Sequence, residues 1–188
     1  MDKIKIVAIV GSLRKESYNR QLAILAKEYL QDRAEFIIVD YENVPLLNQD
    51  YEYPAPIEVS SVRMIVKEAD AIWFFVPEYN HFFPGVLKNL MDWLSRPISE
   101  HESQVLAKKP AAISGISMGI AGTGIAQDHF VALISFLNMD VMNVPRVTIP
   151  SLMQYLDNSG KLDVVNIKSQ IEKQADAFVD FVQMRKRI

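Results

Sequence analysis

A polar segment between residues 11 and 20 contains side chains that could bind a phosphate group. It separates an apolar run from the first helical pattern, and Ser12, Ser17 and Asn19 in it offer neutral hydrogen-bond donors. The guanidinium of Arg14 can form charge-assisted bonds to phosphate oxygens. Free N–H groups at the start of a helix also favour an anion. The segment predicts a phosphate site, although a polar turn with a capping serine would have the same composition.

Two common phosphate-binding patterns are absent from this segment. It lacks the Gly-Lys-Ser/Thr ending of the Walker pattern and the Gly-x-Gly-x-x-Gly pattern of dinucleotide-binding folds. The segment therefore favours a mononucleotide phosphate over ATP or a dinucleotide.

A second segment, residues 77–85, is unusually rich in aromatic residues and reads Pro-Glu-Tyr-Asn-His-Phe-Phe-Pro-Gly. Aromatic rings can lie against a flat cofactor or shield it from water. Asn80 and nearby backbone N–H groups could bond the polar edge of a pyrimidine ring. We expect Phe82 and Phe83 to pack on the core or on another subunit instead. His81 is either a loop histidine or a substrate contact.

A third segment, residues 115–124, contains glycines that let the backbone approach a ligand closely, with N–H groups able to donate to ring carbonyls. Its Gly-Ile-Ser-Met-Gly start also matches the Gly-x-Ser-x-Gly elbow of serine hydrolases. A hydrolase acting through Ser117 needs a histidine late in the chain. Only His129 follows Ser117, and it falls within a predicted helix. We keep the hydrolase as the weaker alternative.

The elements that must position these segments are five apolar strands alternating with five helices. Such alternation predicts an α/β fold with a parallel sheet covered on both faces. The strands are predicted at residues 4–10, 36–39, 71–76, 111–116 and 141–147. Ligands bind beyond the carboxyl ends of such strands, which is where the three segments lie.

The helical patterns have three- and four-residue apolar spacing. Ser17 or Asn19 could cap the first helix, and Pro84 could occupy the first turn of the third. Residues 42–56 are predicted to be a loop. The apolar residues that form these helical patterns lie within residues 22–30, 62–69, 84–94 and 130–137, and from about residue 163 to residue 182.

Composition limits the classes of function. The 188 residues carry a formal net charge of −3 and no cysteine. The charge gives no case for nucleic acid, and the lack of cysteine excludes disulfides, iron–sulfur clusters and thiol catalysis. The three histidines have no metal-binding spacing, so no metal site is predicted. Without an apolar stretch of about 20 residues or a signal-peptide pattern, we expect no membrane association and a cytoplasmic protein.

Three blocks of the sequence resemble the NADPH-dependent FMN reductase family, which includes quinone, azo-dye and chromate reductases. The similarity spans about residues 4–148. It implies a flavodoxin-like fold, a doubly wound five-stranded parallel sheet with helices on both faces, in one FMN-binding domain over residues 1–188. The blocks that carry it are residues 11–14 with 17–20, residues 77–80 with 84–89 and 92–97, and residues 117–119.

The resemblance implies three groups of FMN-binding residues. The first segment would hold the phosphate, the second would hold the isoalloxazine ring, partly through backbone atoms, and the third would close over the ring. The residues assigned in this way are Ser12, Arg14, Ser17, Asn19, Pro77, Glu78, Tyr79, Asn80, Ser117, Met118 and Gly119.

The resemblance also implies a reaction. FMN would pass hydride from NADPH or NADH to a quinone-like or other small acceptor (a flavin, azo compound or metal oxyanion) by a ping-pong mechanism. No catalytic side chain is assigned, and a homodimer or homotetramer is implied. Residues 81–83, His-Phe-Phe, replace residues that are commonly small in relatives, and Gly122-Thr123 replaces a frequent glycine pair, so the acceptor stays open. The alternative is a flavodoxin-type FMN electron carrier without NAD(P)H turnover.

Overall fold

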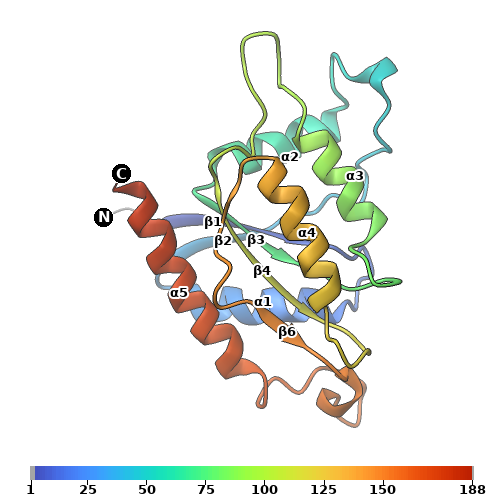
Figure 1. The fold of residues 1–188 in the computed structure, drawn as a ribbon, viewed down its shortest axis with the longest axis vertical. Helices are drawn as coiled ribbons and strands as arrows, with labels where there is room; N and C mark the ends of the chain where they lie inside the picture. Colours follow the sequence, from blue (N-terminus) through green and yellow to red (C-terminus); the bar gives the residue numbers. More distant parts are fainter. Residues whose placement is uncertain (1–2, 188) are drawn as a thin grey trace.

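A parallel sheet lies between two layers of helices in the computed structural model, which describes residues 3–187 (Figure 1). The strands run in the order β2-β1-β3-β4-β5, with β6 also paired to β4. Every pairing between these strands is parallel, so the predicted flavodoxin-like fold is confirmed. The strands are β1 (Ile4–Val10), β2 (Ala34–Ile38), β3 (Ala71–Phe75), β4 (Pro110–Ile116), β5 (Asp140–Val141) and β6 (Val147–Ile149).

Five α-helices cover the sheet. They are α1 (Tyr18–Leu30), α2 (Ile57–Glu68), α3 (Gly85–Leu94), α4 (Gly124–Phe136) and α5 (Lys168–Lys186). Helices α1 and α5 pack on one face, and α2, α3 and α4 pack on the other (Figure 1). Alternate side chains of β1 pack against the two helix layers: Ile6 packs on the α1/α5 side and Val7 on the other. The central strands are therefore apolar on both faces.

A buried polar network crosses the α1/α5 side of the sheet. The indole Nε1–H of Trp73 donates to Ser114 Oγ at 2.8 Å, and the Ser114 hydroxyl donates to Gln174 Oε1. The Gln174 amide then donates to the backbone oxygens of Ile113 and Pro145 at 2.8 and 2.9 Å. Each group has a partner, so the polar atoms impose little desolvation cost.

The edge of the sheet differs from the sequence prediction. One strand is predicted over residues 141–147, but the structure contains two short strands, β5 and β6, both paired with β4. Pro145 lies between them and has no N–H for the ladder, while its carbonyl accepts from Gln174 of α5. The chain therefore leaves β4 after β5 and returns at Val147.

Two predicted helix starts are also wrong. Helix α5 begins at Lys168 and not near residue 163, because Leu156 and Leu162 form a bridge and Asp163 N donates to Tyr155 O at 2.6 Å. This keeps the preceding segment in a turn after a short 3-10 helix, η2 (Leu152–Tyr155). Pro84 occupies the N-cap position of α3 and not its first turn.

The predicted loop at residues 42–56 is fastened to α3 and contains a 3-10 turn, η1 (Gln49–Tyr51). The Asn89 side chain donates to Pro45 O and accepts from Leu47 N, both at 2.8 Å, and Trp93 Nε1 donates to Pro45 O. The Arg96 guanidinium lies 2.6 Å from Glu52 and lowers the pKa of that carboxyl. Asn89 and Trp93 of α3, together with Arg96 just after it, therefore hold this loop in place.

Of the helices in residues 3–187, none is both long and apolar enough to cross a membrane. The same residues contain no group of histidine, aspartate and glutamate side chains arranged to hold a metal ion.

Candidate functional site

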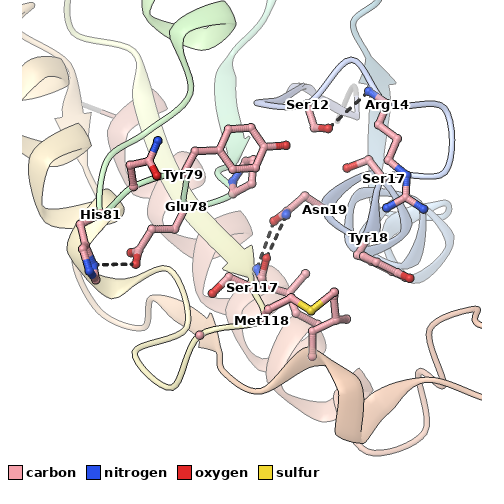
Figure 2. A pocket seen from close by; sticks show the side chains of 15 residues that line it. Ser12, Arg14, Ser17, Tyr18, Asn19, Glu78, Tyr79, His81, Ser117 and Met118 are labelled. Atoms are coloured by element: carbon pink, nitrogen blue, oxygen red, sulfur yellow. Dashed lines mark hydrogen bonds and ion pairs between the residues drawn. The ribbon is translucent and has the colours of Figure 1, made fainter.

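A cavity of about 430 Å³ lies beyond the carboxyl ends of β1, β3 and β4 (Figure 2). This volume is within the usual range for small-molecule sites. The structure brings all eleven predicted binding residues to its wall. Four further residues line it: Tyr18, His81, Ile116 and Leu152.

The end of the cavity that is predicted to bind a phosphate lies at the start of α1. Ser12 Oγ accepts from Arg14 N at 3.3 Å, and Ser17 Oγ caps the helix by accepting from Arg20 N at 3.4 Å. Each hydroxyl therefore uses its oxygen toward the backbone and keeps its hydrogen for another acceptor. In the first helical turn, Arg20 N is bonded to Ser17 Oγ, whereas the N–H groups of Tyr18 and Asn19 have no intrahelical partner. This end offers several donors to an anion.

Arg14 adds a positive charge beside these donors. Its guanidinium lies 5.2 Å from the centre of the Tyr18 ring. Among residues 3–187, no carboxylate lies within ion-pair distance of it. The charge is thus held in place by an aromatic face and is not neutralised by an acidic neighbour.

Asn19 has a different role from the predicted phosphate donor. Its Nδ2 donates to Ile116 O at 3.0 Å, and its Oδ1 accepts from Ile116 N at 3.1 Å. The side chain is buried and joins the start of α1 to the end of β4 (Figure 2). Asn19 lines the cavity but mainly fixes the distance between the first and third segments.

The second segment forms a tight hairpin. Tyr79 and Phe82 exchange backbone hydrogen bonds of 2.9 and 3.0 Å, and the two residues between them, Asn80 and His81, have φ of 53° and 59°. Two positive φ values in a two-residue loop define a type I′ turn. Asparagine and histidine tolerate this region better than most residues. The turn presents its backbone at the cavity wall.

The side chain of Glu78 anchors this hairpin to α4. Its Oε2 accepts from Ala126 N at 3.0 Å in the first turn of the helix, and its Oε1 lies 3.4 Å from His81 Nδ1. A carboxylate is favoured at the positive end of a helix. Glu78, predicted as a ring contact, thus directs its carboxylate to α4 and His81.

The neighbouring phenylalanines pack as predicted. Phe83 is buried and its ring meets that of Phe130 at 5.3 Å. Phe82 lies 4.5 Å from Phe83 and 4.6 Å from the His129 ring, measured between centroids. These rings attach the hairpin to α4 from outside the cavity.

The third segment does not form a hydrolase elbow. The Ser117 hydroxyl donates to Gly122 O, and in residues 3–187 it makes no hydrogen bond to a histidine. His129 instead packs against Phe82. A Cβ on Gly115 would come within 2.3 Å of Val76 O and of the Thr123 side chain, so close packing explains that glycine. Residues 3–187 therefore contain no catalytic triad around Ser117, and close packing accounts for Gly115 in the Gly-x-Ser-x-Gly match.

The chemistry of the wall fits FMN. One end offers hydroxyls, N–H groups and a guanidinium, and the other offers an aromatic hairpin and a glycine-containing loop. Glu78 is the sole carboxylate lining the cavity, and it is already bonded to Ala126 and paired with His81. Nothing in the described wall therefore opposes a phosphate.

Part of this wall lies outside the residues predicted from the sequence. Leu152 comes from η2, which follows β6, and reaches the site because its N–H donates to Ser117 O at 3.0 Å. No local pattern marks that contact. Tyr18 could have been found, because it begins α1 directly after the capping Ser17.

Comparison with known proteins gives a consistent result. The family described as NADPH-dependent FMN reductase matches residues 4–154. A 2-hydroxy-1,4-benzoquinone reductase from Burkholderia sp is 34% identical over 97% of this chain and 98% of its own. An NAD(P)H-dependent FMN reductase from Pseudomonas aeruginosa is 37% identical over 94% of each chain. Among solved structures, the FerB flavoenzyme NAD(P)H:(acceptor) oxidoreductase of Paracoccus denitrificans has a TM-score of 0.85 at 28% identity, covering 97% of this chain and 98% of that one.

Proposed function

Because the chain belongs to the NADPH-dependent FMN reductase family, we propose that the cavity beyond β1, β3 and β4 is its FMN site. The protein is an NAD(P)H-dependent oxidoreductase with FMN as cofactor. The assignment of the site rests on one observation. Hydrogen-bond donors suited to an anion at the start of α1 and the aromatic hairpin at residues 79–82 line the same cavity.

The phosphate would lie at the start of α1. The Ser12 and Ser17 hydroxyls and the first-turn N–H groups donate to its oxygens, and Arg14 supplies the compensating charge. Asn19 holds this end at a fixed distance from β4 through Ile116. The donors are therefore in place before the ligand arrives, which lowers the entropic cost of binding.

The flat ring would lie between the hairpin and the third segment. Pro77 and the backbone at Tyr79 and Asn80 face it from one side, and residues 117–119 face it from the other. When bound, FMN supplies the hydride chemistry of the reaction. The protein contributes binding, orientation and exclusion of water.

The substrate side of the site has an aromatic and an apolar contact. Tyr79 and Met118 line the cavity and are 54% and 63% exposed. A nicotinamide and a planar quinone can both pack against such side chains. We infer that NAD(P)H and a quinone-like acceptor use this side in turn, which is a ping-pong sequence. The Burkholderia relative is named for a hydroxyquinone, which supports a quinone acceptor here.

Steady-state kinetics test this function. The FMN-loaded protein should oxidise NADPH or NADH in the presence of a water-soluble benzoquinone. Double-reciprocal plots at several quinone concentrations should be parallel, because one product leaves before the second substrate binds. Intersecting lines would contradict the shared site. Negligible turnover with quinone, azo and flavin acceptors would favour an electron carrier.

Replacement of Arg14 tests the phosphate end. Arg14→Ala should weaken FMN binding by about 1.5–3 kcal/mol, the usual contribution of hydrogen bonds to a charged group. Titration of the apoprotein with FMN, followed by flavin fluorescence, measures this. Lys15→Ala is the matched control, since Lys15 is an exposed neighbouring cation outside the cavity wall. Equal losses in both variants would indicate a general charge effect and not a phosphate contact at Arg14.

A largely apolar stripe on α4 supports a homo-oligomer. Ile125, Ala132 and Phe136 lie at helical spacing on the exposed side of the helix, with the His129 ring between them, and Phe136 is 85% exposed. Soluble monomers rarely leave such a face uncovered. We infer that a second copy of the chain covers it, giving a homodimer or, with a further interface, a homotetramer.

A charge placed in this stripe should separate the subunits. Ala132→Asp combined with Phe136→Asp should reduce the mass measured by size-exclusion chromatography with light scattering to that of one chain. Burying unpaired carboxylates in an interface is costly. Val165→Asp, which alters an exposed apolar residue outside α4, should keep the wild-type mass. A monomeric wild type, or an unchanged mass in the double variant, would reject this interface.

A further inference from the structure

A carboxylate–imidazole pair stands at the wall of the proposed FMN cavity. Glu78 Oε1 lies 3.4 Å from His81 Nδ1 (Figure 2), and the His81 side chain is 76% exposed whereas that of Glu78 is only 9% exposed. Both residues line the cavity. A nearly buried carboxylate thus faces an imidazole that solvent can reach.

The position of Glu78 is fixed independently of His81. Its second oxygen, Oε2, accepts from Ala126 N at 3.0 Å, and the Thr123 side chain makes no competing cap bond to α4. A carboxylate at the start of a helix interacts favourably with the helix dipole. Glu78 can therefore act as a stationary negative partner.

The imidazole of His81 is oriented by the turn and by this partner. His81 is the second of the two central residues of the type I′ turn, after Asn80. With Nδ1 facing Glu78, the other ring nitrogen, Nε2, points away from the carboxylate. Within residues 3–187, Glu78 is the one charged group at ion-pair distance from His81. The loop at residues 117–123 and the first turn of α4, residues 124–127, carry no charged side chain. Further along α4, Asp128 is paired with Arg146, and the His129 ring packs against Phe82.

The reaction requires a proton at the acceptor. NAD(P)H, a quinone and one proton give NAD(P)⁺ and a hydroquinone. Hydride supplies both electrons and one hydrogen, so the NAD(P)H is oxidised and the quinone is reduced. The remaining oxygen of the product would carry a negative charge until a proton reaches it. A donor at the cavity wall can deliver that proton as the charge develops.

We propose that His81 is this proton donor and that Glu78 is its positioning residue. The Nε2–H bond of the imidazolium breaks, the O–H bond of the hydroquinone forms, and the exposed ring then regains a proton from water. Glu78 holds Nδ1–H and thereby keeps Nε2 directed away from itself. This inference rests on the proposed quinone reductase function, and it assigns a catalytic role where the sequence pattern assigns none.

Stopped-flow measurement of the FMN-loaded protein tests the proposal. The protein is first reduced with one equivalent of NADPH without oxygen and then mixed with benzoquinone between pH 6 and 9. The wild-type rate of the acceptor step should fall as pH rises, because the donor loses its proton. His81→Gln should slow this step at pH 6 about 10- to 100-fold, at or below the low end of general-acid effects because water competes, and should abolish its pH dependence.

A second readout does not depend on turnover. Nitrogen-15 NMR of the histidine rings in the apoprotein should show neutral His81 with its hydrogen on Nδ1. Glu78→Gln should keep the acceptor for Ala126 N but mix the two tautomers, and it should slow the acceptor step less than His81→Gln does. His101→Gln, on the exposed loop before β4, should match the wild type in every measurement.

The outcomes distinguish a failure of the proposed function from a failure of the role assigned to His81. If NADPH fails to reduce the wild-type protein, the proposed function fails. If NADPH reduces it but His81→Gln shows the wild-type acceptor rate and pH profile, His81 is not the donor. A neutral His81 with its hydrogen on Nε2 would overturn the role of Glu78.

Discussion

The Asn19 side chain bonds both backbone groups of Ile116, and the shape of the cavity depends on this contact. It fastens the start of α1 to the end of β4, so the anion donors and the third segment face each other at a set distance. A second contact works in the same way, because Gly11 has no side chain and lets the Pro77 ring approach; a Cβ there would lie 2.9 Å from Pro77 Cδ. Parallel strands bring three loops to one edge, and these contacts join them.

The residues around the cavity divide into those that hold the wall and those that face a ligand. The polar side-chain atoms of Asn19 and Glu78 form hydrogen bonds mainly to the protein backbone. Ser12, Ser17 and Arg14 have hydrogen-bond donors that, within residues 3–187, have no protein acceptor. This division follows from preorganisation: groups that bind without rearrangement need neighbours that lock them first. It also explains why short polar motifs mix structural and binding residues.

Much of the fold could be predicted from apolar periodicity, because β1, β3 and β4 are buried on both faces and the runs that form them are nearly continuous. The split between β5 and β6 was not predictable in this way, since it depends on Pro145 and on its bond to the distant Gln174. For the site, sequence position predicted which segments meet. It could not show that Asn19 faces a backbone 97 residues away, because such pairings exist only in the folded chain.

The central claim is that these segments form one cradle for a flat ring with a single phosphate. Titrating the apoprotein in parallel with FMN and with riboflavin, which lacks the phosphate, tests it most directly. We expect one FMN to bind per chain and riboflavin to bind at least about tenfold more weakly, since the donors at α1 lose their charged partner. Equal affinities for the two flavins, or no binding of FMN, would contradict it.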